Sequence, residues 1–167
     1  MTLLMWALFS PSAMAVDVCR GAEVQTDRVS GVQSMRMTES ELVLDVTDGV
    51  ATVTAPASLP GLVDVVVPAG TELLLVLEDG TKVTFRTSAP VTPKGTAWAS
   101  QYAAGVFTTW TLAWSVSAEA AHAVASSRPV ALRYTLADHP FAVDYTTAVG
   151  TKRQRLYACA ANQALAE

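Results

Sequence analysis

Hydrophobic and polar residues alternate in short runs along most of the chain, and Gly, Pro and Asp interrupt these runs. Val and Thr are abundant within the runs, and β-branched residues favour strands over helices. An alternation of period two places one side of each strand against a core and the other side toward water. The pattern therefore predicts a mainly β protein that is built from antiparallel hairpins.

The first hairpin is predicted around Asp48-Gly49. These residues separate Glu41–Thr47 from Val50–Ala55, and a two-residue Asp-Gly turn sets the register so that Thr47 faces Val50. The apolar side chains of both strands then fall on one side, as a buried face requires. They are Leu42, Leu44, Val46, Ala51, Val53 and Ala55.

A second hairpin is predicted around Asp79-Gly80, between Glu72–Glu78 and Thr81–Thr87. A two-residue turn at this point places Leu74 opposite Phe85 on the inward side. The first strand is apolar on both faces, so a second layer should also cover its outward face. That outward face holds Leu73, Leu75 and Leu77.

Two more strands and a helix are predicted in the centre and second half of the chain. Leu62–Val67 is predicted to be a strand that ends at Pro68-Ala69-Gly70. Val106–Val116 alternates as a strand does, and its even-numbered residues face inward. Ser117 has the position of an N-cap for a short Ala-rich helix that ends near Ser126. Between these elements, Ser88–Gly105 has no clear strand period and is predicted to be an irregular loop.

The last part of the chain predicts a third hairpin and a helix. Val130–Leu136 and Phe141–Tyr145 pair through a turn at Ala137-Asp138-His139-Pro140, and Thr151 with Gln154 resembles a capping box that opens the helix. The best architecture is an antiparallel β-sandwich with one or two short helices near the C-terminus, and an open half-barrel is the alternative. Residues 16–167 are expected to form a single domain.

Residues 1–15 have the features of a secretory signal. Leu3–Phe9 is a short apolar run, and Ala13-Met14-Ala15 has small residues at both positions that signal peptidase reads. Cleavage is predicted after Ala15, although the segment lacks the Lys or Arg that usually precedes the apolar run; the alternative is a buried N-terminal segment of the domain. We therefore expect a periplasmic or extracellular protein.

The chain has two cysteines, Cys19 and Cys159, near its two ends. In an oxidising compartment such a pair predicts one disulfide that ties the termini together. Two unpaired buried thiols are the alternative. A redox centre would need the two residues close in sequence, which they are not.

Composition excludes several classes of function. The chain has 11 Lys and Arg against 15 Asp and Glu, a net charge of −4, so it lacks the basic character of a nucleic-acid-binding protein. A hydrophobic fraction of 51% argues against a disordered chain. The sequence contains no motif for a phosphate-binding loop or a nucleophile elbow, and no cofactor is expected.

A dispersed hydrolase site is the least favoured function. Its base would be His122, in the Ala-rich helix, or His139, in a turn, and each is better explained by local structure. The two His residues have no zinc-site spacing. Asp64 stands in the predicted strand among Val residues without an evident role, but solvated acids on sheet faces explain the carboxylates.

The loop Ser88–Gly105 is the predicted contact region for a partner or ligand, because long loops in compact domains are often functional. Trp and Tyr provide rigid contact area, so Trp98 and Tyr102 are the leading candidates. Lys94 and Gln101 are polar candidates in the same loop.

A basic cluster of Lys152, Arg153 and Arg155 lies in the first turns of the predicted last helix. Cations at that position oppose the helix dipole, so helix stability does not explain them. An acidic partner or lipid head groups are possible ligands, but a solvated helix face is the favoured interpretation.

Three hypotheses for function follow. The first is an exported, non-enzymatic module that binds a protein partner or contributes to an assembly. The second is a small inhibitor or immunity-type protein that acts on an envelope enzyme, and the third is the hydrolase. An inhibitor would present Ser88–Gly105 as a rigid protrusion, whereas an assembly module would expose a sheet edge or an apolar patch. That patch would lie over Leu73, Leu75 and Leu77.

Overall fold

A computed structural model describes residues 18–101, 103–136 and 138–164. The predicted signal with its cleavage site at Ala15 and the candidate Tyr102 lie outside these residues, so both stay predictions. Within the described ranges, the strands form a six-stranded and a four-stranded antiparallel sheet. The prediction of a mainly β, two-sheet sandwich with helices is confirmed.

The six-stranded sheet has the order β1-β2-β3-β4-β8-β7 and the four-stranded sheet the order β10-β9-β5-β6. In the first sheet the strands are β1 (Glu23–Thr26), β2 (Gln33–Glu39), β3 (Leu42–Thr47), β4 (Val50–Pro60), β8 (Ala104–Val116) and β7 (Lys94–Ala99). In the second they are β10 (His139–Asp144), β9 (Pro129–Leu136), β5 (Glu72–Leu77) and β6 (Lys82–Arg86).

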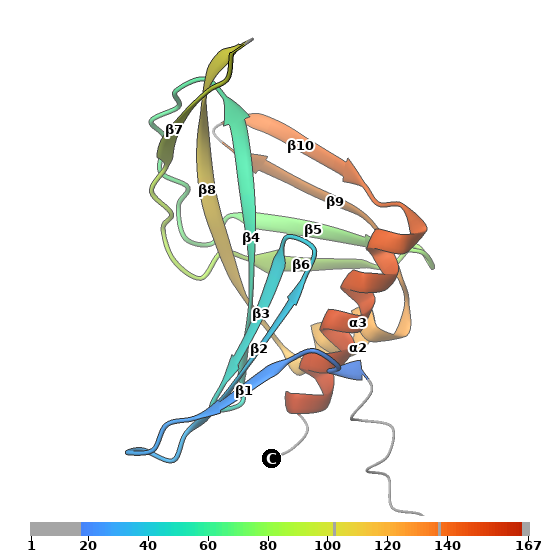
Figure 1. Cartoon of the computed structure of the whole chain (residues 1–167). Helices are drawn as coiled ribbons and strands as arrows, with labels where there is room; N and C mark the ends of the chain where they lie inside the picture. Colours follow the sequence, from blue (N-terminus) through green and yellow to red (C-terminus); the bar gives the residue numbers. More distant parts are fainter. Residues whose placement is uncertain (1–17, 102, 137, 165–167) are drawn as a thin grey trace, which may run out of the picture.

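The two sheets face each other with their strands crossing steeply, and two helices complete the core (Figure 1). The helices are α2 (Ala118–Ser126) and α3 (Thr147–Ala164). The last helix contacts β2, β3, β4 and β9, and α2 packs against α3. The four-stranded sheet and α3 thus cover different parts of the same inner face of the larger sheet.

The first hairpin has the predicted register, and β8 has the predicted inward face from Thr108 onward. Thr47 faces Val50, and Asp48 and Gly49 both have positive φ, as a two-residue turn of this kind requires. Even-numbered residues of β8 from Thr108 to Val116 are buried. Ser117 caps α2 as predicted, since its side chain accepts a hydrogen bond from the backbone of Ala120.

The predicted register of the second hairpin is wrong by one residue. Leu73, not Leu74, faces Phe85, and the turn has three residues rather than two. The Gly80 N–H donates to the carbonyl of Leu77, and Gly80 adopts a φ of +85°, which is typical of a type I turn followed by a bulge. The shift exchanges the two faces of β5 and leaves those of β6 as predicted. Leu73, Leu75 and Leu77 are therefore buried, and the apolar patch that an assembly module was expected to show here does not exist.

Two boundaries near the C-terminus also differ from the prediction. Leu136 pairs with His139, so only residues 137 and 138 separate the paired strands, and His139 belongs to β10 rather than to the turn. The last helix begins at Thr147, because the Thr146 hydroxyl accepts from the Val149 N–H. The Thr151 hydroxyl lies inside the helix and donates to the carbonyl of Thr147.

Candidate functional site

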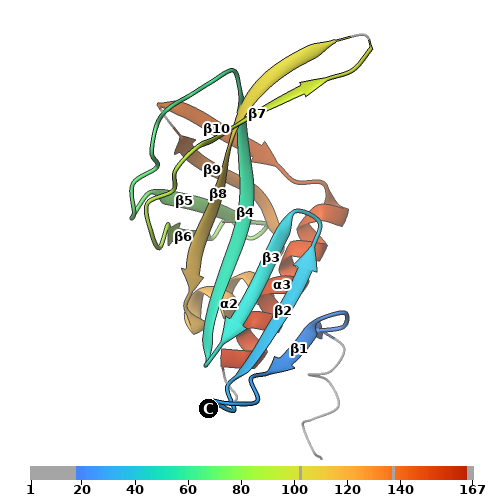
Figure 2. The ribbon, with the colours of Figure 1, turned by 60° about the vertical axis from the view of Figure 1, so that its left-hand side comes forward.

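The segment that was predicted to be an irregular loop is largely a β-hairpin. Its residues 94–99 form β7, which pairs with the beginning of β8 from Ala99–Ala104 to Lys94–Thr109. This β7–β8 hairpin rises beyond the rest of both sheets (Figures 1 and 2). The irregular part is therefore shorter than predicted, and the hairpin is the most projecting feature of the described chain.

Trp98 lies on the outward face of this hairpin. It pairs with Gly105, and a Cβ atom on Gly105 would lie 2.6 Å from the Trp98 Nε1, so the indole covers the glycine. The indole remains 47% exposed. Lys94 is also exposed, and it lies on the same face as Trp98 because the two residues are four positions apart along the strand. Gln101 is exposed just beyond the end of β7.

The opposite face of the hairpin exposes apolar side chains that the sequence did not predict to be exposed. Val106 was predicted to be buried but is 41% exposed, because the hairpin projects beyond the second sheet that covers the rest of β8. Leu62 is 76% exposed, and its Cδ2 would lie 3.0 Å from a Cβ atom on Gly95. The glycine in β7 thus allows Leu62 to lie against the hairpin.

Residues 62–67 do not form the predicted strand. Side chains of β8 bind the backbone here: the Thr108 Oγ1 accepts from the Val63 N–H at 2.8 Å and donates to the Gly61 carbonyl at 2.9 Å. The Trp110 Nε1 donates to the Val65 carbonyl at 3.0 Å. These contacts replace a sheet ladder, and they anchor the segment at the base of the hairpin.

A cavity of about 270 Å³ lies between this segment and the hairpin. Asp64, which had no evident role in the sequence, is an exposed residue of its wall. Val65 and Val66 in the same segment are also exposed. The apolar run that predicted a strand thus lies partly on the surface.

The residues considered for a hydrolase are on the surface. His122 is exposed on α2, where the Ser126 hydroxyl donates to its backbone carbonyl, and His139 is exposed at the first residue of β10. Among the residues that the structure describes, no group of three or more His, Cys, Asp or Glu could hold a metal ion.

Two members of the basic cluster make contacts within the fold, while Lys152 and Arg155 are exposed, as the predicted solvated helix face requires. Arg155 forms an ion pair with the buried Glu39, and the guanidinium of Arg153 lies 4.3 Å from the centre of the Tyr145 ring. Only Lys152 is exposed without such a contact. Because α3 begins at Thr147, these cations lie beyond its first turn and do not oppose the dipole there.

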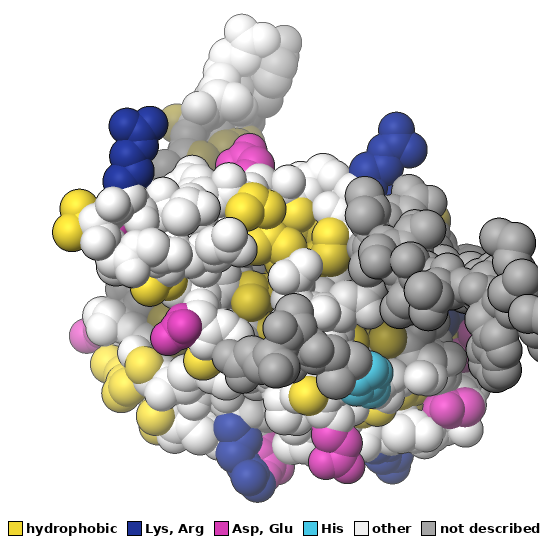
Figure 3. Space-filling view, turned by 90° about the horizontal axis from the view of Figure 1, so that it is seen from below, with side chains coloured by type: hydrophobic (Ala, Val, Ile, Leu, Met, Phe, Trp, Pro, Cys, Tyr) yellow, Lys and Arg dark blue, Asp and Glu magenta, His cyan; other side chains and the backbone are white. Residues whose placement is uncertain are grey.

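Other charged side chains form pairs at the ends and on the surfaces of the sheets. The bidentate bond from Arg128 lowers the pKa of Glu78, and further pairs join Arg36 to Asp45 and Arg133 to Asp144. Figure 3 shows basic and acidic side chains scattered around one face, with neither sign gathered into a patch. Charge therefore does not mark a binding surface on that face.

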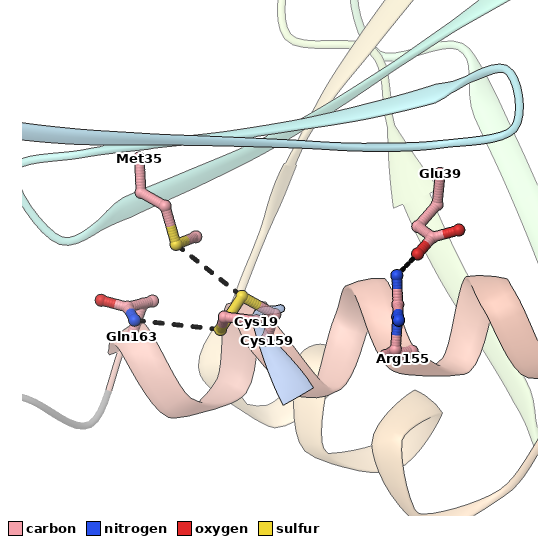
Figure 4. The surroundings of a disulfide bond; sticks show 6 residues. All are labelled: Cys19, Met35, Glu39, Arg155, Cys159 and Gln163. Carbon is pink, nitrogen blue, oxygen red and sulfur yellow. Dashed lines mark hydrogen bonds and ion pairs between the residues drawn. A yellow bond between two sulfur atoms is a disulfide. The ribbon is translucent and has the colours of Figure 1, made fainter. Parts of the chain in front are cut away.

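The predicted disulfide between Cys19 and Cys159 is present, and it joins the segment before β1 to α3 (Figure 4). The Cys159 sulfur is fully buried, 3.7 Å from the Met35 sulfur of β2. Within the described ranges, no helix is both long and apolar enough to cross a membrane. The disulfide is compatible with an exported protein.

Comparison with protein-family models, with curated proteins and with solved structures yields no match for this chain.

Proposed function

We propose that the protein is an exported, non-enzymatic module that binds a protein partner through the β7–β8 hairpin. The observation that carries the proposal is the exposure of apolar side chains on both faces of a projecting hairpin. Trp98 is exposed on one face, and Leu62 and Val106 are exposed on the other. Water contact with such side chains is unfavourable, so a surface of this kind indicates an interaction site.

The character of the exposed residues supports a protein partner. An indole provides a large, rigid contact area at low entropic cost, and aromatic side chains are enriched where proteins bind tightly. Lys94 and Gln101 are exposed near Trp98 and would supply the polar rim of such a contact. The disulfide supports an oxidising compartment, which agrees with the signal predicted in residues 1–15.

The test is site-specific photo-crosslinking in the producing cells. A photoreactive phenylalanine analogue replaces Trp98 in one variant and Thr111, an exposed residue further along the outward face of β8, in the control variant. We expect adducts with another protein at position 98 and none at position 111. Absence of adducts at position 98, or equal adducts at both positions, would contradict the proposal.

An inhibitor of an envelope enzyme is the second candidate, because the segment forms an ordered protrusion rather than an irregular loop. In that case the purified chain should slow a periplasmic or secreted hydrolase, and Trp98→Ala should weaken the inhibition at least tenfold (~1.4 kcal/mol), a loss usual for a central aromatic contact. An inhibition that Trp98→Ala leaves unchanged would contradict this role for the hairpin.

A further inference from the structure

The two sheets have four edge strands, and three of them carry features that discourage pairing with another chain. The edge strand β10 contains Pro140, β6 has a charged residue at each end, and β1 has only four residues. Proline, charge and short length are the usual protections of a sheet edge. The remaining edge, β7, has six exposed residues and no charged or proline residue after Lys94.

The direction of the free backbone groups of β7 follows from its partner strand. The Val106 carbonyl accepts from the Gly61 N–H at 2.8 Å, on the side where β4 lies, so the backbone of Val106 points away from β7. Facing residues in an antiparallel pair either bond to each other or both point away. Ala97 faces Val106, so its N–H and carbonyl point to the open edge.

The same orientation recurs at every second residue, so Gly95 and Ala99 also present their backbone groups at the open edge. In the described part of the chain, no backbone hydrogen bond from another segment reaches these groups. All three residues are small, which allows another strand to approach closely.

The edge is also complementary to itself. If two copies pair antiparallel with Ala97 on a two-fold axis, Gly95 lies opposite Ala99 of the second copy, and all three facing pairs exchange both of their hydrogen bonds. On the outward face, Thr96 then lies opposite Trp98 of the second copy. No like charges meet between residues 95 and 99, because these residues are uncharged.

We propose that β7 is a dimerisation edge, which pairs antiparallel with β7 of a second copy of this chain and joins the two six-stranded sheets. This inference does not depend on the proposed function, because edge pairing uses backbone groups and leaves Trp98, Leu62 and Val106 on the faces of the hairpin. The contact is small, so we expect a weak and concentration-dependent dimer.

The test is sedimentation velocity of the oxidised full chain between about 10 µM and 1 mM, a range that suits a small interface. Ala97→Pro removes one N–H from the open edge, and Ala97→Lys places a charge there. Both substitutions are at a residue whose N–H and carbonyl take no part in the hydrogen bonds to β8, and Pro is tolerated at such a site. Val24→Lys is the matched control, because it adds the same charge to an exposed residue of β1, the other edge of this sheet.

We expect the mean mass of the wild-type chain and of Val24→Lys to rise toward twice the monomer value. Both Ala97 variants should dimerise at least tenfold more weakly while keeping the wild-type circular dichroism spectrum and melting temperature. The proposal is overturned if the wild-type chain stays monomeric throughout, if a folded Ala97→Lys dimerises as the wild type does, or if Val24→Lys is equally impaired. A monomeric wild type that still gives adducts at position 98 would refute only the dimer.

Discussion

At the scale of single residues, an aromatic cluster joins α3 to both sheets. The Trp114 Nε1 of β8 donates to the Tyr157 hydroxyl of α3 at 3.2 Å, and the Phe85 ring of β6 lies 5.6 Å from the Tyr157 ring. Tyr157 is 2% exposed, and burial raises the pKa of its hydroxyl. Burial likewise raises the pKa of Tyr145 to about 12, although the cation of Arg153 beside it acts in the opposite direction.

These raised pKa values predict a loss of stability in alkali. The folded state holds the phenolic protons more tightly than the unfolded state, whose tyrosines titrate near pH 10. The contribution to stability is complete below about pH 10 and is lost as the pH rises toward and beyond 12, the pKa of Tyr145. Urea unfolding at a series of pH values, with tyrosinate absorbance followed in parallel, measures this loss.

The control for this prediction is Tyr157→Phe. We expect a smaller alkaline loss than in the wild type, together with a lower stability of about 1–3 kcal/mol at neutral pH, because the buried Trp114 N–H loses its partner. An alkaline loss as large as in the wild type would contradict the role of Tyr157.

At the scale of elements, the segment after β4 depends on side chains rather than on a sheet. Thr108 bonds to both Val63 and Gly61, and it is only 1% exposed. The position of Leu62 against the hairpin therefore depends on one hydroxyl group of β8.

We expect Thr108→Val, which keeps the shape of the side chain, to destabilise the fold by about 1–3 kcal/mol because two backbone groups lose their partner. The Val63 amide should exchange hydrogen faster by more than the loss in global stability explains. The exchange rates of the β3 amides should rise only as much as that loss explains. Hydrogen exchange followed by NMR measures both. A Val63 amide that is as protected as in the wild type would show that other contacts anchor the segment.

At the scale of the whole molecule, the disulfide closes nearly the entire described chain into one loop. Cys19 and Cys159 are separated by 140 positions in the sequence. In the chain-entropy account, a cross-link over such a distance restricts the unfolded state strongly. It also holds α3 against β2 through the contact of Cys159 with Met35.

Replacing both Cys19 and Cys159 by Ser should lower the free energy of unfolding by about 4–5 kcal/mol. Denaturant unfolding of the wild type with and without reductant, beside the double variant, measures this difference. Reductant should bring the wild type to the stability of the double variant and leave the variant unchanged. A difference below about 1 kcal/mol would mean that the disulfide contributes little.

The sequence alone determined those features for which local constraints agree. Asp48-Gly49 and the polarity of both flanking strands require the same register, so the register of the first hairpin could be predicted, although β4 continues beyond the predicted Ala55 to Pro60. The two cysteines had only each other as partners. The strict alternation along β8 identified its buried face, apart from Val106.

Tertiary structure decided the features that depend on distant residues. The first strand of the second hairpin is apolar on both faces, so its polarity could not choose between a two-residue and a three-residue turn at Asp79-Gly80. Residues 62–67 were predicted to be a strand, but Thr108 bonds to the Val63 N–H and Trp110 to the Val65 carbonyl from more than forty positions away. The exposure of Val106 depends on how far the second sheet extends, and no local pattern encodes that limit.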